Sequence, residues 1–208
     1  FRGAGGLWEG YRLEDVATPE GWDRNPGLVL DFYNQRRKTA LEAKPNKGHR
    51  ILAELEKYFE VTIITQNVDN LHERAGSSRI LHLHGELTKI RSSVDENYVK
   101  DIGYEDISLG DLCPKGGQLR PHIVWFGEAV PLIDTAARIC EEAHIFVVIG
   151  SSLNVYPAAG LINFVKPGIP IFVIDPNPVL IPSKRNIEFI KTGAEEGVGI
   201  LTEKLLKL

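Results

Sequence analysis

The chain has 208 residues, 43% of them hydrophobic, which suits one compact domain or one domain with a sizeable insertion. A formal net charge of -4 gives no general attraction to nucleic acid or to an anionic membrane. No apolar run is long enough to span a bilayer, no secretory signal pattern is present, and two cysteines are too few for a disulfide framework, so we expect a cytoplasmic protein.

In chain order, the first predicted elements are two consecutive helices, at residues 26–43 and 46–59. They are separated at Lys44-Pro45, and Asn46 is a plausible cap of the second helix. The next elements are short β-branched runs, which predict buried strands because polar and apolar residues hardly alternate in them. These runs cover residues 61–65, 79–84, 122–126, 145–150 and 169–175.

Segments with helical spacing lie between or after the later strands, at residues 132–143, 156–165 and 197–208. Strands alternating with helices indicate an α/β fold, a Rossmann-like parallel sheet with helices on both faces. We assign residues 1–25, 60–90 and 119–208 to this domain. Two insertions, the helical segment 26–59 and the polar segment 91–118, would form a smaller lobe.

The stretch TQNVDNLHERAGSSRILHLHGEL, residues 65–87, places polar side chains directly after a strand. Gln66, Asn67 and Asp69 would face the ligand crevice at the carboxyl end of a parallel sheet, although a capped turn into a helix would also explain them. His82 and His84 would share one face of the next strand, with Gly85 allowing close approach of another backbone. The two histidines could be metal ligands, a catalytic base or structural residues.

The strand at 145–150 continues as GSSLNVYPAAG, where small residues would let backbone donors approach a nucleotide phosphate. The dehydrogenase pattern G-x-G-x-x-G does not occur. Taken together and in this order, the motifs FRG, TQNVDNLHERAG, HLHGEL, WFGEAVP and GSSLNVYPAAG resemble the sirtuin family of NAD-dependent protein lysine deacylases. GLWEGYRLEDVATPEGW and DFYNQRRK are most similar to its bacterial class III-like members, which are related to deacylases of acidic acyl groups.

The resemblance implies a role for each matching residue. His84 would be the catalytic general base, acting on a hydroxyl of the nicotinamide ribose. The residues expected to bind NAD are Phe1, Arg2, Gln66, Asn67, Val68, Asp69, Gly150, Ser151, Ser152, Asp175, Pro176, Asn177 and Ala194. The residues expected to bind the acylated lysine peptide, as an added strand and through its acyl group, are Tyr33, Arg36, Phe126, Gly127, Leu153, Asn154 and Val155.

The implied reaction uses NAD as a reactant. The acyl oxygen of the substrate lysine would attack the anomeric carbon as nicotinamide leaves, and His84 would then help a ribose hydroxyl attack the resulting alkylimidate. Addition of water to the intermediate would then complete the reaction, and the products would be free lysine, nicotinamide and O-acyl-ADP-ribose. A mono-ADP-ribosyltransferase would use the same pocket, and a non-catalytic fragment that binds NAD or acylated peptide is a third interpretation.

Tyr33 and Arg36 lie three residues apart on a predicted helix, so they share a face and could bind a carboxylate. A solvated basic face, formed by Arg36, Arg37 and Lys38, is the competing interpretation. Because the pair matches the Y-x-x-R signature of the family, we expect removal of succinyl or malonyl groups besides acetyl.

Three departures from the family pattern stand out. Ser92 and Ser93 replace one cysteine pair of the zinc site and Cys113 is the only cysteine nearby, so we expect no zinc; Cys140 should be a buried helix residue. The chain begins just past the position of the G-A-G-x-S loop, and we expect an upstream segment in the natural protein. Asp175 stands where relatives often have Asn.

The expected partner is acylated lysine in a protein or peptide. We expect no nucleic acid or membrane partner, and we expect a monomer.

Overall fold

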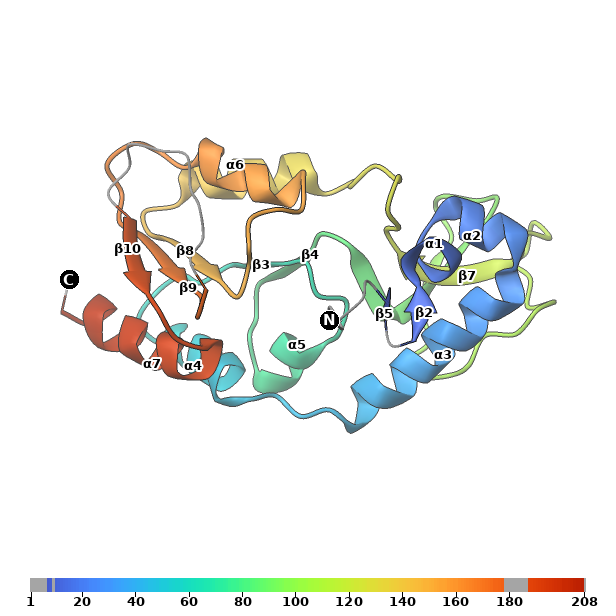
Figure 1. Cartoon of the computed structure of the whole chain (residues 1–208), viewed down its shortest axis with the longest axis horizontal. Helices are drawn as coiled ribbons and strands as arrows, with labels where there is room; N and C mark the ends of the chain where they lie inside the picture. Colours follow the sequence, from blue (N-terminus) through green and yellow to red (C-terminus); the bar gives the residue numbers. More distant parts are fainter. Residues whose placement is uncertain (1–6, 9, 178–186, 208) are drawn as a thin grey trace. The chain divides into compact units, whose positions relative to one another are not determined.

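The computed structural model describes residues 7–8, 10–177 and 187–207, so Phe1 and Arg2 lie outside the described residues. The chain forms two compact units (Figure 1). The first unit comprises Phe1–Ala43, Asn67–Asn70 and His84–Val130, and the second comprises Lys44–Gln66, Leu71–Leu83 and Pro131–Leu208.

These units do not follow the expected division into a Rossmann-like domain and a lobe made of residues 26–59 and 91–118. Residues 1–25 belong to the first unit, and the proposed helical insertion is shared between both units. The reason is packing: α3 (Pro26–Glu42) buries Val29 and Phe32 in the core of the first unit, whereas α4 (Lys47–Leu55) buries Leu55 in the core of the second.

The first unit begins with an antiparallel hairpin and three helices and continues with a three-stranded antiparallel sheet of order β6-β5-β7. Its elements are β1 (Leu7–Trp8), β2 (Tyr11–Arg12), α1 (Leu13–Val16), α2 (Pro19–Arg24), α3, β5 (Gly85–Ser92), β6 (Val99–Asp101) and β7 (Leu119–Ile123). The expected parallel strand at 122–126 is therefore wrong in bounds and direction, because β7 begins earlier and pairs antiparallel with β5.

Local sequence explains where α2 and α3 start. The side chains of Thr18 and Asn25 accept hydrogen bonds from the backbone N–H groups three residues further on, at 3.0 and 3.1 Å, and a proline follows each cap. In the core of the first unit, the buried side chains of Phe32 and Tyr33 on α3 cluster with Leu87 of β5 and Ile123 of β7. Helix α3 thereby presents one face to the interior of this unit.

The second unit contains the parallel strands, in a pair β3-β4 and a group ordered β10-β9-β8. Its elements are α4, β3 (Ile63–Thr65), α5 (Leu71–Ala75), β4 (Ile80–His82), α6 (Ile133–Glu142), β8 (Phe146–Ile149), the 3-10 helix η1 (Ala158–Phe164), β9 (Ile171–Ile174), β10 (Ile187–Ile190) and α7 (Ala194–Leu205). β10 was not predicted, and the predicted helix at 156–165 is a 3-10 helix.

Helices cover both sides of the β8–β10 group (Figure 1). On one side, α4 and α7 pack around the buried side chains of Phe172 and Ile174 on β9. On the other side lie α6 and η1, which pack against each other. This is the Rossmann-like α/β architecture that the sequence predicts.

The cap at Asn46 is confirmed, in the form of a capping box. The Asn46 Oδ1 atom accepts a hydrogen bond from the backbone N–H of His49 at 3.1 Å, and the Asn46 backbone N–H lies 3.3 Å from the His49 Nδ1 atom. Among the described residues, no helix combines the length and apolar character needed to cross a membrane.

Candidate active site

His84 lies in the turn that connects β4 to β5. The expectation that His82 and His84 share one strand face is wrong, because β4 ends at His82 and the chain turns before β5 begins at Gly85. The backbone carbonyl of His84 accepts a hydrogen bond from the N–H of Val124 at 2.9 Å. This backbone hydrogen bond therefore holds the position of His84 within the first unit.

The close backbone approach expected at Gly85 is confirmed. Gly85 has φ of +81°, and a Cβ atom at this position would lie 1.9 Å from the carbonyl oxygen of His122. Only glycine combines this φ with this contact at low energetic cost. Gly85 thus allows β5 and β7 to pair directly beside the His84 backbone.

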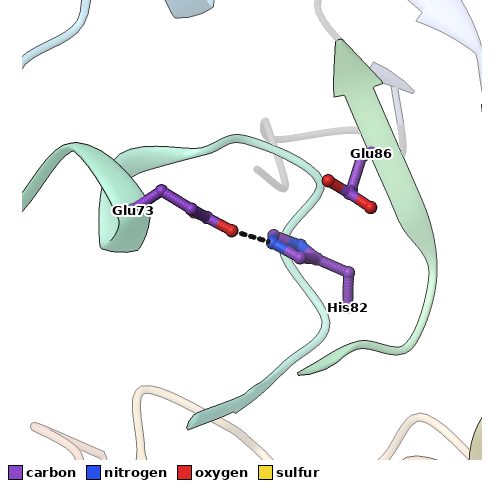
Figure 2. Close-up of side chains that lie close together, drawn as sticks. All are labelled: Glu73, His82 and Glu86. Atoms are coloured by element: carbon purple, nitrogen blue, oxygen red, sulfur yellow. Dashed lines mark hydrogen bonds and ion pairs between the residues drawn. The ribbon is translucent and has the colours of Figure 1, made fainter. Parts of the chain in front are cut away.

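His82 has a different environment from His84. Its imidazole is buried, and the Nε2 atom lies 2.8 Å from the Oε1 atom of Glu73 on α5 (Figure 2). Figure 2 also draws Glu86, which belongs to the first unit. A buried imidazole paired with a carboxylate fits the structural interpretation of His82, because the pair links α5 to β4.

The segment Asn67–Asn70 follows β3 and belongs to the same unit as His84. The carbonyl of Val68 accepts a hydrogen bond from the N–H of Leu87 on β5 at 2.8 Å, and the Asn70 side chain accepts one from the Tyr104 hydroxyl at 2.9 Å. Asn67 is exposed and Asp69 is half-buried. Two anchors therefore fix the polar segment, one of them at Leu87 on β5, three residues after His84. Gln66, immediately before it, belongs to the second unit.

In the second unit, three predicted nucleotide-binding segments follow three neighbouring strands. Gly150, Ser151 and Ser152 follow β8; Asp175, Pro176 and Asn177 follow β9; and Ala194 begins α7, shortly after β10. Because β8, β9 and β10 are parallel and in register, with Ile149 opposite Ile174 and Ile174 opposite Ile190, these segments meet at one edge. That edge is where ligands bind in open parallel sheets.

The segment after β8 has backbone geometry suited to a ligand loop. Gly150 has φ of +59°, and its N–H donates to the carbonyl of Ile174 at 2.8 Å. Leu153 also has positive φ, +52°, which is uncommon for a non-glycine residue, and its N–H donates to the Ser151 Oγ atom at 3.3 Å. Ser152 and Asn154 are exposed, whereas Val155 is half-buried.

Asp175 also lies in a defined turn. Its Oδ1 atom accepts a hydrogen bond from the backbone N–H of Asn177 at 2.8 Å, and its own N–H donates to the carbonyl of Ile190 at 3.3 Å. The Asp175 side chain is half-buried, and Pro176 and Asn177 are exposed.

Tyr33 and Arg36 share the buried face of α3, at 1% and 6% exposure. The solvated basic face is therefore wrong for Arg36 and also for Arg37, which is fully buried and donates to the Glu105 carbonyl at 3.0 Å. Only Lys38 points to solvent, where it pairs with Asp106 at 2.8 Å. Two arginines on one helix thus have different roles: Arg37 anchors a loop, and Arg36 lies beside Tyr33.

The electrostatics around Tyr33 are unusual for a tyrosine. Burial raises the pKa of the phenol above its ordinary value, against the opposing effects of a hydrogen bond from Trp125 and the positive charges of Arg36 and Arg120. The Trp125 Nε1 atom donates to the Tyr33 hydroxyl at 3.1 Å. Tyr33 consequently remains protonated at neutral pH, although the positive charges of Arg36 and Arg120 lie nearby.

A cluster of charged residues, formed by Glu128, Arg120 and Arg91, adjoins Trp125. The sequence did not predict this cluster. Glu128 accepts two hydrogen bonds from Arg120, at 2.9 and 3.1 Å, one from Arg91 at 3.0 Å and one from the Trp125 backbone at 2.8 Å. Burial would raise the pKa of Glu128, but the hydrogen bonds from Arg120 and Trp125 hold it below its ordinary value. Glu128 belongs to the WFGE motif, which was the one sequence feature that pointed to this cluster. In that motif, a role was predicted for Phe126 and Gly127 alone.

Phe126 and Gly127 form a turn after Trp125. Phe126 is 49% exposed although it is aromatic, and its N–H donates to the Ala17 carbonyl at 3.0 Å. Gly127 has φ of +90°. An exposed aromatic side chain on an anchored loop is compatible with the expected contact to a peptide.

The residues at the family's zinc position do not fit a zinc ion. Cys113 is the only thiol among the described residues of this segment, and Ser92 donates to its Sγ atom at 3.1 Å. The Ser92 Oγ atom also accepts from the backbone N–H groups of Val94 and Asp95, at 3.1 and 3.0 Å. One thiolate cannot form a closed four-ligand site, and here hydrogen bonds join the two turns that zinc would join. Cys140, as expected, is buried on α6.

We predict that metal analysis of the purified protein will find far less than one zinc per chain. Ser92→Ala should lower the free energy of unfolding by about 1–3 kcal/mol, since two part-buried hydrogen bonds from the backbone N–H groups of Val94 and Asp95 are lost. Ser93→Ala, one residue further, is the matched control. Stoichiometric zinc, or a Ser92→Ala variant as stable as the control, would contradict this description of the segment.

The fold and the site define a nucleotide-binding α/β protein with a histidine in the turn between two strands. The chain belongs to the Sir2 family, whose sequence model matches residues 1–157. It is 59% identical over 211 residues to an NAD-dependent protein deacylase of Bacteroides thetaiotaomicron, covering 99% of this chain and 90% of that protein. It is 51% identical over 208 residues to a protein of the same name from Helicobacter pylori, covering 100% and 90%.

Solved structures agree with this assignment. A crystal structure of a Sir2 homologue in complex with NAD has a TM-score of 0.86 and 37% identity, covering 100% of this chain and 82% of that one. Sir2Tm bound to a propionylated peptide has a TM-score of 0.78 and 28% identity, covering 92% and 84%. The fold expected from the sequence motifs is thereby confirmed.

Proposed function

We propose that the protein is an NAD-dependent protein lysine deacylase that releases nicotinamide and O-acyl-ADP-ribose. Membership of the Sir2 family carries this proposal, and the similarity to proteins named NAD-dependent protein deacylase supports it. NAD is consumed as a co-substrate. The other partner is an acylated lysine in a protein or peptide.

The proposed reaction gives each motif residue a role. His84 is the general base, and Asn67, Val68 and Asp69 bind the nicotinamide end of NAD. Gln66 orients the ribose, and the loops after β8, β9 and β10 bind the rest of the dinucleotide. Phe126, Gly127 and the segment 153–155 hold the substrate peptide through main-chain hydrogen bonds.

We further propose that the enzyme removes acidic acyl groups, succinyl and malonyl, as well as acetyl. Tyr33 and Arg36 lie on one face of α3, both are buried, and the environment of Tyr33 contains two positive charges. A carboxylate at the end of the acyl chain would satisfy the Tyr33 donor and pair with the Arg36 guanidinium. An acetyl group offers no such contact.

The selective variant is Arg36→Ala. We expect kcat/KM for a succinyl-lysine peptide to fall about 10- to 100-fold, since a charge-assisted hydrogen bond contributes roughly 1.5–3 kcal/mol, while the acetyl-lysine peptide loses much less. Products would be followed by mass spectrometry at saturating NAD. Lys38→Ala, two residues away and exposed, is the control.

Equal losses on both peptides would contradict the acidic acyl preference and leave the deacylase assignment intact. Transfer of ADP-ribose to protein without release of O-acyl-ADP-ribose would instead favour the mono-ADP-ribosyltransferase. Failure to bind NAD, measured by calorimetry on the chain together with any sequence that precedes Phe1 in its gene, would favour a binding fragment.

We also propose that the protein acts in the cytoplasm and as a monomer. The two buried, unpaired cysteines fit a reducing compartment. The formal net charge of -4 gives no electrostatic attraction to nucleic acid. Sedimentation in the presence of NAD would test the oligomeric state.

A further inference from the structure

The hydroxyl of Tyr33 takes part in one hydrogen bond, and that bond does not use the proton of the hydroxyl itself. The Trp125 indole N–H can only donate, so the Tyr33 oxygen acts as the acceptor in the 3.1 Å hydrogen bond between them. Among the described residues, no group accepts the Tyr33 proton in return. A buried donor without an acceptor costs about 1–3 kcal/mol. The Tyr33 proton is therefore available to a ligand that brings an acceptor.

The indole of Trp125 is itself held firmly. The Arg120 Cζ atom lies 3.4 Å from the centroid of the Trp125 ring, a cation–π contact. The Trp22 ring also packs against the indole, with centroids 5.7 Å apart. Trp125 is 2% exposed, so its N–H has little freedom to point elsewhere.

Glu128 fixes the position of Arg120, whose guanidinium stacks on the Trp125 indole. Both carboxylate oxygens bind Arg120, and one of them also accepts from the Trp125 backbone N–H. Arg91 adds a further ion pair at 3.0 Å. The negative charge of Glu128 is thus fully engaged by positive groups, and it does not act as an acceptor for Tyr33.

We propose that Glu128, Arg120 and Trp125 are positioning residues that orient the Tyr33 hydroxyl toward the acid end of the bound acyl group. This inference rests on the proposed acidic acyl preference. The chain of contacts determines which way Tyr33 donates: Glu128 holds Arg120, Arg120 holds the indole, and the indole N–H occupies one side of the phenolic oxygen. The proton is left for the carboxylate of succinyl- or malonyl-lysine, whereas acetyl-lysine has no group to receive it.

The test is a double-mutant cycle on Tyr33→Phe and Trp125→Phe, with kcat and KM measured for succinyl-lysine and acetyl-lysine peptides. Trp125→Phe keeps an aromatic ring but removes the N–H donor. We expect the succinyl-to-acetyl ratio of kcat/KM to fall about fivefold to tenfold, mainly through KM for the succinyl peptide. Because Trp125 acts through the Tyr33 hydroxyl, the double variant should be no worse than Tyr33→Phe alone.

Arg120→Lys is a second, independent test, because lysine keeps the positive charge but cannot form the bidentate ion pair with Glu128. It should lower the same ratio in the same direction, and its far-ultraviolet circular dichroism should match that of the wild type. Equal losses on both peptides, or effects of Trp125→Phe and Tyr33→Phe that multiply, would overturn the positioning network while leaving the acyl preference standing. A wild-type enzyme that processes only acetyl-lysine would overturn both.

Discussion

Replacing His84 with asparagine should reduce the steady-state formation of O-acyl-ADP-ribose from acetyl-lysine peptide by about 10²- to 10⁴-fold, the usual contribution of a general base, because His84 acts after nicotinamide has left. Asparagine can retain a polar side chain in the turn between β4 and β5 but cannot take up a proton at neutral pH. The rate is measured by mass spectrometry under saturating NAD and peptide, so that the loss appears in kcat.

Two observations make this a test of chemistry and not of folding. The backbone of His84 is held by the Val124 N–H and by the pairing of Gly85 with Ile123, neither of which involves the imidazole. His144→Asn, at an exposed position just before β8, is the control and should retain wild-type turnover. A His84→Asn enzyme within threefold of the wild type would remove His84 from the proposed reaction.

The second large effect is expected from Gly85→Ala. Adopting φ of +81° costs a non-glycine residue about 1–3 kcal/mol. The new Cβ would also meet the His122 carbonyl oxygen at 1.9 Å, so β5 and β7 could no longer pair at this point. We expect the free energy of unfolding to fall by more than about 3 kcal/mol in urea, because a single special backbone site and a steric clash act together.

Gly103→Ala separates the two contributions. Gly103 also has positive φ, +57°, but an added Cβ there has no neighbour within 4 Å among the described residues. This control should lose only the backbone contribution, about 1 kcal/mol. If the two variants are equally stable, the close approach of β5 and β7 beside His84 is not required by the fold.

Local sequence was sufficient for the features that depend on neighbouring residues. The cap at Asn46 is confirmed because capping involves groups within three residues. The strands near 145–150 and 169–175 are confirmed within a few residues because continuous β-branched runs seldom form anything else in a parallel sheet. The need for glycine at position 85 was also visible, although its contact with His122 was not.

Features that depend on partners distant in sequence could not be obtained in this way. The antiparallel direction of β7 is decided by its pairing with β5, some thirty residues earlier, and not by its own composition. In the same way, α3 and α4 are adjacent in sequence but lie in different units, because each buries its apolar side chains in a different core.

The sequence by itself determined the α/β class, the Sir2-type motifs with His84 and Asn67–Asp69, and the pairing of Tyr33 with Arg36 three residues apart. The α/β class follows from periodicity, and the motif residues follow from the resemblance to the sirtuin family. Only the tertiary structure decided that Arg36 and Arg37 are buried while Lys38 is not, and that Trp125 donates to Tyr33 from a segment 92 residues away. Burial and hydrogen-bond partners are properties of packed neighbours, and the linear order of residues does not contain them.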